Sequence, residues 1–234
     1  MNVLWILAHP EPQSLNGALR DEGIATLRSL GHEVRESDLY AMQWNPVVDK
    51  IGTVPDDVRA EHEKLAWADT VVVQFPLWWF GTPAILKGWI DRVLVRGYGY
   101  DVRGEDGRVR RYGEGTLAGK RALTVVTTGG SEAAFSARGI AGPLDDLLFN
   151  LHHGTFFYTG MSVLPPVTVF DTVRMTQEDY ELAVEQLRKR LHSLETTEPL
   201  PFRSQNGGDY DRSLVLRPEI DPGRSGYDVH LRAG

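Results

Sequence analysis

The sequence predicts a doubly wound α/β domain, in which a mostly parallel sheet is covered by helices on both faces. Apolar runs with strand character alternate along the chain with amphipathic stretches of helical periodicity. Parallel neighbours need crossover connections, and helical crossovers hide both faces of such a sheet. The run Val71-Val72-Val73 is typical of a central strand that is buried on both sides.

The expected elements alternate from the first strand to the last helix. The expected strands are Val3–Ala8, Glu33–Asp38, Thr70–Phe75, Ala122–Thr127 and Gly160–Phe170. The expected helices are Asn16–Leu30, Pro55–Ala66, Pro83–Val95, Pro143–His153 and Thr176–Leu194. Open sheets of this kind bind ligands outside the carboxyl ends of their strands. We therefore expect a binding site in the loops after the first, third and fourth strands.

Composition narrows the classes of function. With 234 residues and 41% hydrophobic content, the chain can bury one substantial core, which favours a single domain with a tail. The net charge of −7 gives no long-range attraction to nucleic acid or anionic lipid, so a small-molecule or protein partner is expected. The absence of cysteine excludes thiolate chemistry, disulfides and iron–sulfur clusters, and no metal site is expected. Redox chemistry would therefore need a bound cofactor.

The start of the chain and its hydropathy predict a cytoplasmic protein. The apolar run Met1–Ala8 lacks a basic leading segment and a small-residue cleavage site, so it indicates a strand rather than a signal peptide. No apolar stretch is long enough to span a bilayer, and no membrane insertion is expected.

Two segments depart from the alternating pattern. Residues 98–117 contain a turn signal at Glu105–Gly107 and are expected to form either a lid or a solvated excursion. Residues 201–234 are polar and broken by Pro and Gly, which predicts an extended C-terminal arm after a domain of residues 1–200. Such arms often wrap a partner subunit. The cluster of Arg108, Arg110 and Arg111 in residues 98–117 is expected to form a solvated face rather than a binding patch.

The first of the three loops runs from His9 to Gly17 and enters the first expected helix. Backbone N–H groups and the positive end of the helix dipole face outward together there, which is typical of a phosphate-binding loop. Ser14 and Asn16 can add side-chain hydrogen bonds to such a ligand. In the alternative interpretation Ser14 only caps the helix and His9 is a structural histidine.

The second loop carries the consecutive aromatic residues Trp78, Trp79 and Phe80. Thr82 has the chemistry of a helix cap, and Pro83 suits the first helical turn. Three aromatics on one short loop cannot all point into the same core, so we expect at least one to face a ligand or another subunit. The loop would then form a rigid wall beside a planar ring system. In the alternative interpretation all three are core residues.

The third loop contains the pair Gly129-Gly130, where a ligand can approach the backbone closely. These amides can hydrogen-bond the pyrimidine end of a flavin, although a doubled glycine is also found in ordinary turns. The helix after the aromatic loop carries an apolar arc too broad for one sheet to cover, so a homodimer packed partly on this helix is expected. The arc consists of Ile85, Leu86, Trp89, Ile90, Val93 and Leu94.

These motifs together resemble the FAD-dependent NAD(P)H:quinone reductase (DT-diaphorase) family and its bacterial members. The resemblance rests on stretches within Leu7–Asn16, Glu36–Pro46, Gln74–Trp89 and Thr127–Ser131. It implies a flavodoxin-like fold with a five-stranded parallel sheet of order 2-1-3-4-5. It also implies a homodimer with flavin sites at the subunit interface, in which NAD(P)H and a quinone-like acceptor react in turn by a ping-pong mechanism. FAD is favoured over FMN as the bound flavin.

The resemblance also implies roles for particular residues. Gly129 and Gly130 would act in catalysis, because their amides can stabilise the anion that develops on the reduced ring. The implied flavin contacts are His9, Ser14, Leu15, Asn16, Pro76, Leu77, Trp78, Trp79, Phe80, Thr127, Thr128, Gly129 and Gly130. The implied acceptor pocket, to which the neighbouring subunit contributes, consists of Trp79, Phe80, Tyr100, Val102, Phe135, Ala141 and Tyr158.

Four positions depart from the family's pattern. Phe135 and Ala141 stand where well-known members have a tyrosine and a histidine that stabilise charge on the reduced flavin, and neither can donate a hydrogen bond. Val102 replaces a tyrosine, which predicts a wider acceptor pocket, and Tyr180 replaces a basic residue near the adenosine part of the cofactor.

These departures leave other functions open. A regulatory flavoprotein subunit of a potassium-efflux system would need no efficient hydride transfer. A biosynthetic reductase would direct the same chemistry to another conjugated acceptor. A one-electron flavodoxin carrier is disfavoured, because the chain is much longer than a minimal doubly wound domain. The preference for NADH or NADPH stays open, because no adenosine-binding fingerprint is present.

Overall fold

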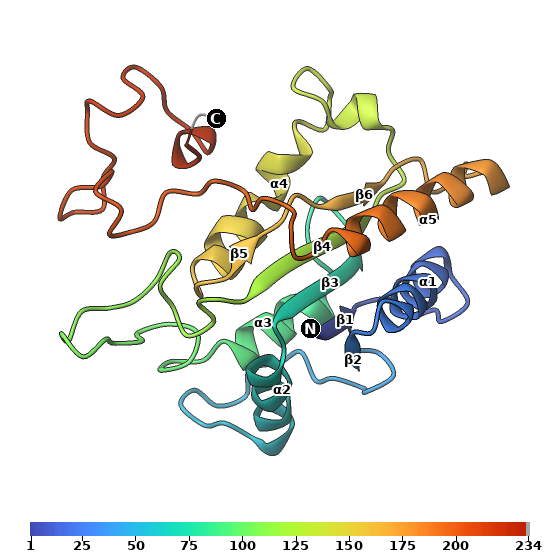
Figure 1. Cartoon of the computed structure of the whole chain (residues 1–234), viewed down its shortest axis with the longest axis horizontal. Helices are drawn as coiled ribbons and strands as arrows, with labels where there is room; N and C mark the ends of the chain where they lie inside the picture. The colour runs from blue at the N-terminus through green and yellow to red at the C-terminus, as the bar shows by residue number, and fades with distance from the viewer. Residues whose placement is uncertain (233–234) are drawn as a thin grey trace.

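A parallel sheet forms the centre of the protein, whose computed structural model describes residues 1–232 (Figure 1). The strand order is β2-β1-β3-β4-β5, and β6 also pairs with β4. All of these strand pairs are parallel, which confirms the predicted fold class and the predicted order 2-1-3-4-5. The strands are β1 (Asn2–Leu7), β2 (Glu33–Asp38), β3 (Thr70–Pro76), β4 (Arg121–Thr127), β5 (Ser162–Val163) and β6 (Val167–Val169).

The prediction of one last strand over Gly160–Phe170 is wrong. Two short strands lie beside β4 instead, with β5 paired to the beginning of β4 and β6 paired to its end. Pro165 and Pro166 separate them. Proline has no amide N–H to donate to a ladder, so pairing is interrupted at this point and resumes after it.

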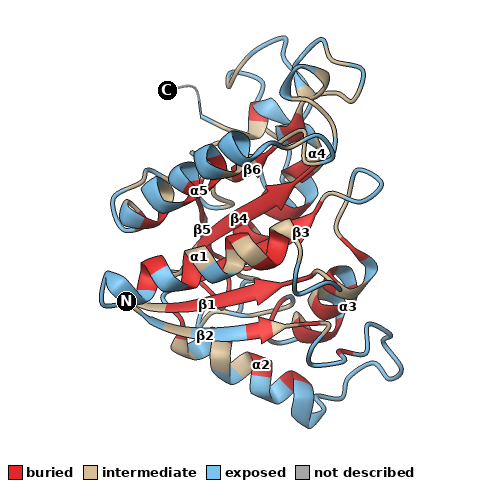
Figure 2. Ribbon diagram, turned by 90° about the vertical axis from the view of Figure 1, so that its right-hand side faces the viewer, coloured by how far each residue is buried: buried red, intermediate tan, exposed pale blue. Residues whose placement is uncertain are grey.

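Helices cover both faces of the sheet (Figures 1 and 2). α1 and α5 share one buried core with Val3 and Trp5 of β1, whereas α2, α3 and α4 share the other with Leu4 and Ile6. This alternation follows from the two-residue period of a strand. The helices are α1 (Leu15–Ser29), α2 (Asp56–Trp67), α3 (Ala84–Val93), α4 (Leu144–Leu151) and α5 (Gln177–His192).

At three helix ends the bounds predicted from local sequence can be compared with the structure. Ser14 caps α1, because its side chain accepts a hydrogen bond from the N–H of Gly17. The predicted cap at Thr82 is wrong: Pro83 occupies the cap position of α3, and no side chain there accepts from the first amides. The predicted helical end at His153 is also wrong, because α4 continues into a π-helix over His152–Phe157.

The strand β3 is buried along its whole length, in agreement with the prediction of a central strand around Val71-Val72-Val73 (Figure 2). It lies between β1 and β4. Gln74 is the one amide side chain in this otherwise largely apolar strand, and it is fully buried. Because buried polar groups need hydrogen-bond partners, Gln74 must be bonded inside the protein.

The excursion of residues 98–117 turns at Gly107, whose φ is 74°. Within it, the Arg110 guanidinium lies 3.0 Å from Asp106 and 3.3 Å from Glu114. Outside it, Nε of Arg111 donates to Oε1 of Gln205 at 2.7 Å. The excursion is therefore fastened to the C-terminal arm.

The arm is held in place by side-chain as well as main-chain hydrogen bonds. Nε of the buried Arg203 donates to the carbonyl of Val229 at 2.9 Å, and its other nitrogens reach Asp209 at 3.0 Å and Asp221 at 2.7 Å. In Figure 1 the arm is the red segment beyond α4, on the same side as the excursion. It thus closes on itself around one guanidinium. That it also wraps a partner subunit stays a prediction.

Candidate functional site

A pocket of about 310 Å³ opens at the carboxyl ends of β1, β3 and β4. It lies where the doubly wound topology predicts a ligand site. Most of its lining was predicted from the three loops, whereas Thr172 and Val173 were missed. These two follow β6, so extending the same rule to the last strand would have found them. The lining residues are His9, Ser14, Leu15, Asn16, Pro76, Leu77, Trp78, Thr127, Thr128, Gly129, Thr172 and Val173.

The loop before α1 is tightly packed. Oγ of Ser14 accepts from the N–H of Gly17 at 3.2 Å, donates to the carbonyl of Glu11 at 2.7 Å and lies 3.0 Å from Nδ1 of His9. A Cβ on Gly17 would lie 1.8 Å from the carbonyl oxygen of Pro12, so only glycine fits there. Ser14 therefore acts as a cap. Leu15 and Asn16, at the N-terminus of α1, line the pocket, and helix N-termini attract anions.

Asn16 bonds within the protein, and its predicted role as a side-chain donor to a ligand stays a prediction. It lines the pocket, but its side chain is buried, and Nδ2 donates to Oγ1 of Thr127 at 3.0 Å. Its main-chain carbonyl accepts from Nε2 of Gln74 at 2.7 Å. The amide of Asn16 therefore links α1 to β4. Gln74 begins one of the stretches that carry the family resemblance, but no role in the site had been predicted for it.

The aromatic loop is a tight, strained turn with its side chains outside the core. The main chains of Trp78 and Gly81 exchange two hydrogen bonds, of 3.1 and 3.0 Å. Trp79 and Phe80 have φ values of 50° and 61°, a region that costs non-glycine residues about 1–2 kcal/mol each. The Trp79 side chain is 97% exposed, and Trp78 and Phe80 are also exposed. The alternative that all three are core residues is wrong.

Neighbouring side chains leave no room for a side chain at Gly129 or Gly130, whether or not a ligand is bound. A Cβ on Gly129 would lie 2.9 Å from Val173, and one on Gly130 would lie 2.8 Å from the ring of Phe135. The N–H of Gly130 donates to Oγ1 of Thr128 at 3.3 Å. Gly129 lines the pocket, whereas Gly130, Trp79 and Phe80 lie outside its lining.

The predicted acceptor residues fall into separate groups in one chain. Phe135 lies near Phe80, with ring centroids 6.3 Å apart, at the same edge as the pocket. Tyr100 and Tyr158 instead line another recess of about 260 Å³, beside α3 and the π-helix. Val102 belongs to the excursion, where its carbonyl accepts from the N–H of Arg110. A single chain therefore does not bring the predicted acceptor pocket together.

A second cluster of ionisable and aromatic groups lies between the arm, the excursion and the π-helix. The ring of His153 stacks on Tyr112 and Phe149, with centroids 4.9 and 4.6 Å apart. Burial, reinforced by the nearby His230, lowers the pKa of His153 to about 4. A cavity of about 300 Å³ is lined by Arg111, Tyr112, Phe149, His153, Arg203, Gln205, Tyr210, Leu214 and His230.

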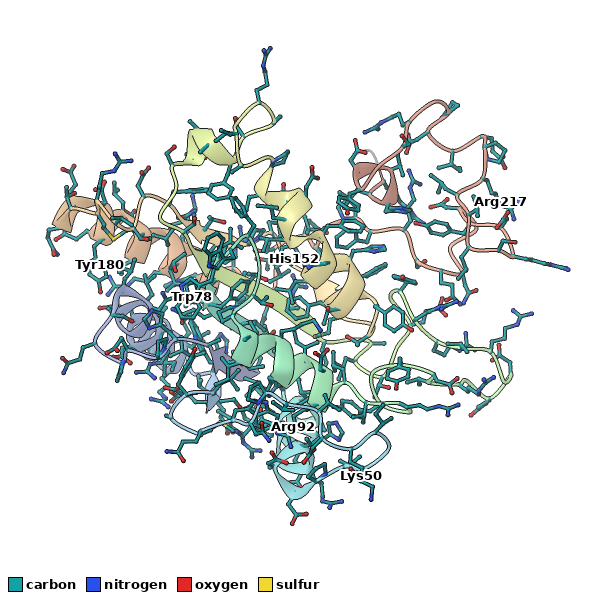
Figure 3. All side chains as sticks on the ribbon, turned by 180° about the vertical axis from the view of Figure 1, so that it is seen from behind. Lys50, Trp78, Arg92, His152, Tyr180 and Arg217 are labelled. Atoms are coloured by element: carbon teal, nitrogen blue, oxygen red, sulfur yellow. The ribbon has the colours of Figure 1, made fainter. Side chains whose placement is uncertain are left out.

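A third histidine, His152 (Figure 3), is buried where α4 passes into the π-helix. Nε2 of His152 lies 2.9 Å from Oγ1 of Thr124, and burial lowers the pKa of His152 to about 4. Sequence reasoning had not singled out either His152 or His153. Among residues 1–232, no group of three or more His, Asp or Glu side chains is arranged to hold a metal ion. No helix in that range is long and apolar enough to cross a bilayer.

Sheet order and pocket position together define a flavodoxin-like α/β protein. The flavodoxin-like fold family matches residues 1–193 of this chain. A ribosyldihydronicotinamide dehydrogenase-like protein of Penicillium crustosum is 44% identical, over 99% of this chain and 96% of its own length. NAD(P)H dehydrogenase (quinone) 1 of Rattus norvegicus is 33% identical, over 93% of this chain and 87% of its own length.

A solved structure extends the similarity to the whole fold. A provisionally assigned quinone reductase of Klebsiella pneumoniae matches with a TM-score of 0.95 and 48% identity, covering 99% of this chain and 100% of its own. The chain therefore belongs to the flavodoxin-like family, in which its relatives include quinone dehydrogenases and reductases.

Proposed function

We propose that the chain is an NAD(P)H-dependent flavoprotein oxidoreductase that reduces a quinone or a similar conjugated acceptor. The observation that carries this proposal is the pocket, in which the start of α1, the aromatic loop and the loop after β4 meet. The similarity to the rat and Klebsiella proteins supports the same assignment. FAD is proposed over FMN on the resemblance of the motifs.

The residues of the pocket have the chemistry that a phosphorylated flavin requires. The first amides of α1 suit the phosphates, because helix N-termini attract anions. Leu77 and Trp78 offer an apolar wall for a flat ring, and Thr128 and Gly129 offer polar groups for its edge. A bound flavin supplies the centre that accepts and donates hydride. One shared position for donor and acceptor would give ping-pong kinetics, with parallel double-reciprocal lines.

We further propose a homodimer, in which each pocket is completed by the partner. The recess with Tyr100 and Tyr158 lies away from the pocket of its own chain, so these residues would serve the pocket of the other chain. The exposed ring of Trp79 would be covered in the same assembly. Sedimentation at micromolar concentration should then give twice the mass of the chain, and a monomer would count against shared sites.

The proposal is tested by the purified protein's absorbance spectrum, mass identification of the flavin released on denaturation and steady-state turnover with NAD(P)H and a panel of quinones. We expect a yellow protein that releases FAD and turns over with parallel kinetic lines. If the protein reduces quinones but its double-reciprocal plots intersect, only the ping-pong mechanism would be contradicted. A colourless protein that takes up neither FAD nor FMN would remove the whole proposal.

A regulatory flavoprotein subunit of a potassium-efflux system is the second candidate. It is favoured by Phe135 and Ala141, because neither side chain can donate a hydrogen bond to a reduced ring. Its signature would be a flavin-loaded protein with negligible quinone turnover that co-purifies with a transporter. Turnover with any quinone at rates typical of enzymes, about 1 per second or more, would favour the reductase.

A further inference from the structure

We propose that Gln74 is a positioning residue for the flavin phosphate: from the centre of the sheet it holds the first turn of α1 at the pocket. This inference rests on the proposed function, because it concerns the same site. Gln74 itself lies outside the pocket lining, so it acts through Asn16.

The side chain of Gln74 is 0% exposed and uses both ends of its amide. Oε1 accepts from Nε1 of Trp5 at 2.9 Å, which ties it to β1. Nε2 donates to the carbonyl oxygen of Asn16 at 2.7 Å, in the first turn of α1. The orientation of this amide is therefore fixed by a donor on one side and an acceptor on the other.

Asn16 continues the chain of hydrogen bonds to the next strand. Its Nδ2 donates to Oγ1 of Thr127 at 3.0 Å, and its Oδ1 lies 3.4 Å from Nε2 of Gln74. Asn16 and Thr127 are both buried. The series Trp5, Gln74, Asn16 and Thr127 thus joins β1, β3, α1 and β4 just beneath the pocket.

Packing alone does not explain a glutamine at this position. The neighbouring side chains Val73 and Phe75 both fill the core on the side of α2, α3 and α4, so the side chain at 74 faces the other core, where an apolar residue would avoid burying an amide. What Gln74 adds is a hydrogen bond to the main chain of Asn16. That bond restrains the first turn of α1, where Leu15 and Asn16 line the pocket, and catalytic or binding groups require such support.

This arrangement separates two parts of flavin binding. The amides of α1 act on phosphate only, whereas Leu77 and Trp78 act on the ring. A change that moves the first turn of α1 should weaken FAD and FMN binding and leave riboflavin, which has no phosphate, nearly unaffected. A general loosening of the fold would weaken all three ligands alike.

The test is the Gln74→Met variant, which keeps the length of the side chain and removes both hydrogen-bonding groups. Dissociation constants of the flavin-free protein for FAD, FMN and riboflavin are measured by fluorescence quenching. We expect FAD and FMN to bind about tenfold more weakly, which corresponds to about 1.4 kcal/mol. Riboflavin affinity should change by about twofold or less. Gln186→Met, at an exposed position of α5, is the matched control.

Trp5→Phe gives a second measurement that does not depend on how well Gln74→Met folds. It removes the indole donor to Oε1 of Gln74, and the smaller ring also loosens the packing of a buried side chain, which should affect all three ligands alike. We expect a smaller loss than for Gln74→Met, with the same preference for phosphorylated flavins. Equal loss for the three ligands, or no loss at all, would overturn the role of Gln74 while leaving the proposed function intact. A wild-type protein that binds none of them would overturn the proposed function itself, and this inference with it.

Discussion

The pocket at the strand ends and the cluster under the C-terminal arm are both built from polar groups near aromatic rings, but they are held together differently. At the pocket, Gln74 and Asn16 are uncharged and each is bonded within the frame of the parallel sheet. Under the arm, a buried guanidinium, Arg203, joins Asp209 and Asp221, and burial among aromatic rings lowers the pKa of His153 to about 4. The pocket therefore depends on sheet topology, and the arm depends on charge.

Removing the charge at Arg203 should break the arm and leave the pocket. Arg203→Ala would leave Asp209 and Asp221 without their shared partner, and breaking a buried ion pair typically costs about 3–5 kcal/mol. We expect a lower unfolding midpoint and rapid proteolytic cleavage within residues 204–228, with the flavin-to-protein ratio retained. Arg217→Ala is the control, because the Arg217 side chain (Figure 3) donates to the carbonyl of Gly208 and forms no ion pair within residues 1–232. Unchanged proteolysis of Arg203→Ala would contradict the dependence of the arm on charge.

Removing an aromatic ring from the loop beside the pocket should weaken flavin binding and leave the stability of the arm unchanged. Trp79→Ala removes a side chain that is 97% exposed, so the free energy of unfolding should change by about 0.5 kcal/mol or less. Flavin should dissociate about tenfold faster, because the contact proposed between the flavin and Trp79, which lies beside the lining of the pocket, is lost. Leu182→Ala, another exposed apolar position, serves as the control. Unchanged flavin occupancy of Trp79→Ala would remove the aromatic loop from the site.

Acidification should loosen the arm before the pocket. Burial holds the pKa of His153 at about 4, below the ordinary value near 6.5, so the unfolded chain binds more protons between these pH values. Stability should therefore fall as the pH is lowered from about 6.5 towards 4. His153→Phe keeps an aromatic ring without titration, so its unfolding midpoint should fall less steeply over this range. A drop as steep as that of the wild type would assign the effect to other groups, such as His152.

The smallest expected effect concerns Phe135. Phe135→Tyr adds a hydroxyl beside the glycine pair, since the Phe135 ring lies against Gly130. A donor at this position should stabilise charge on the reduced ring, and we expect kcat with a quinone to rise about threefold with an unchanged KM. Phe170→Tyr, on a neighbouring ring 6.0 Å away, is the comparison variant. Equal effects of both changes would indicate altered packing instead.

Sequence reasoning could predict the features that depend on the topology of the sheet. The parallel sheet with helices on both faces was predicted from periodicity, whereas the strand order 2-1-3-4-5 was implied only by the family resemblance, and the structure confirms both. The break at Pro165-Pro166 carried a signal that was overlooked, since proline cannot pair within a ladder. The π-helix at His152–Phe157 has no such signal, because its register depends on how α4 packs.

Within the candidate site, sequence reasoning worked best for residues whose position is set by the sheet topology alone. Most of the expected residues follow the carboxyl ends of β1, β3 and β4 and line one pocket. Thr172 also lines it, because it follows the carboxyl end of β6. The role of Gln74 was beyond reach, because its partner Asn16 is 58 residues away in the chain. The link of Arg203 to Asp221 spans 18 residues without any periodic pattern, so it too required the structure.

The central claim is that the pocket at the strand ends holds a flavin that NAD(P)H reduces. Its most direct test is an anaerobic titration of the flavin-loaded protein with NADH and NADPH, followed by visible absorption. The account predicts complete bleaching with one equivalent of donor per flavin and recovery of the colour when a quinone is added. A bound flavin that keeps its oxidised spectrum in excess of both donors would contradict it.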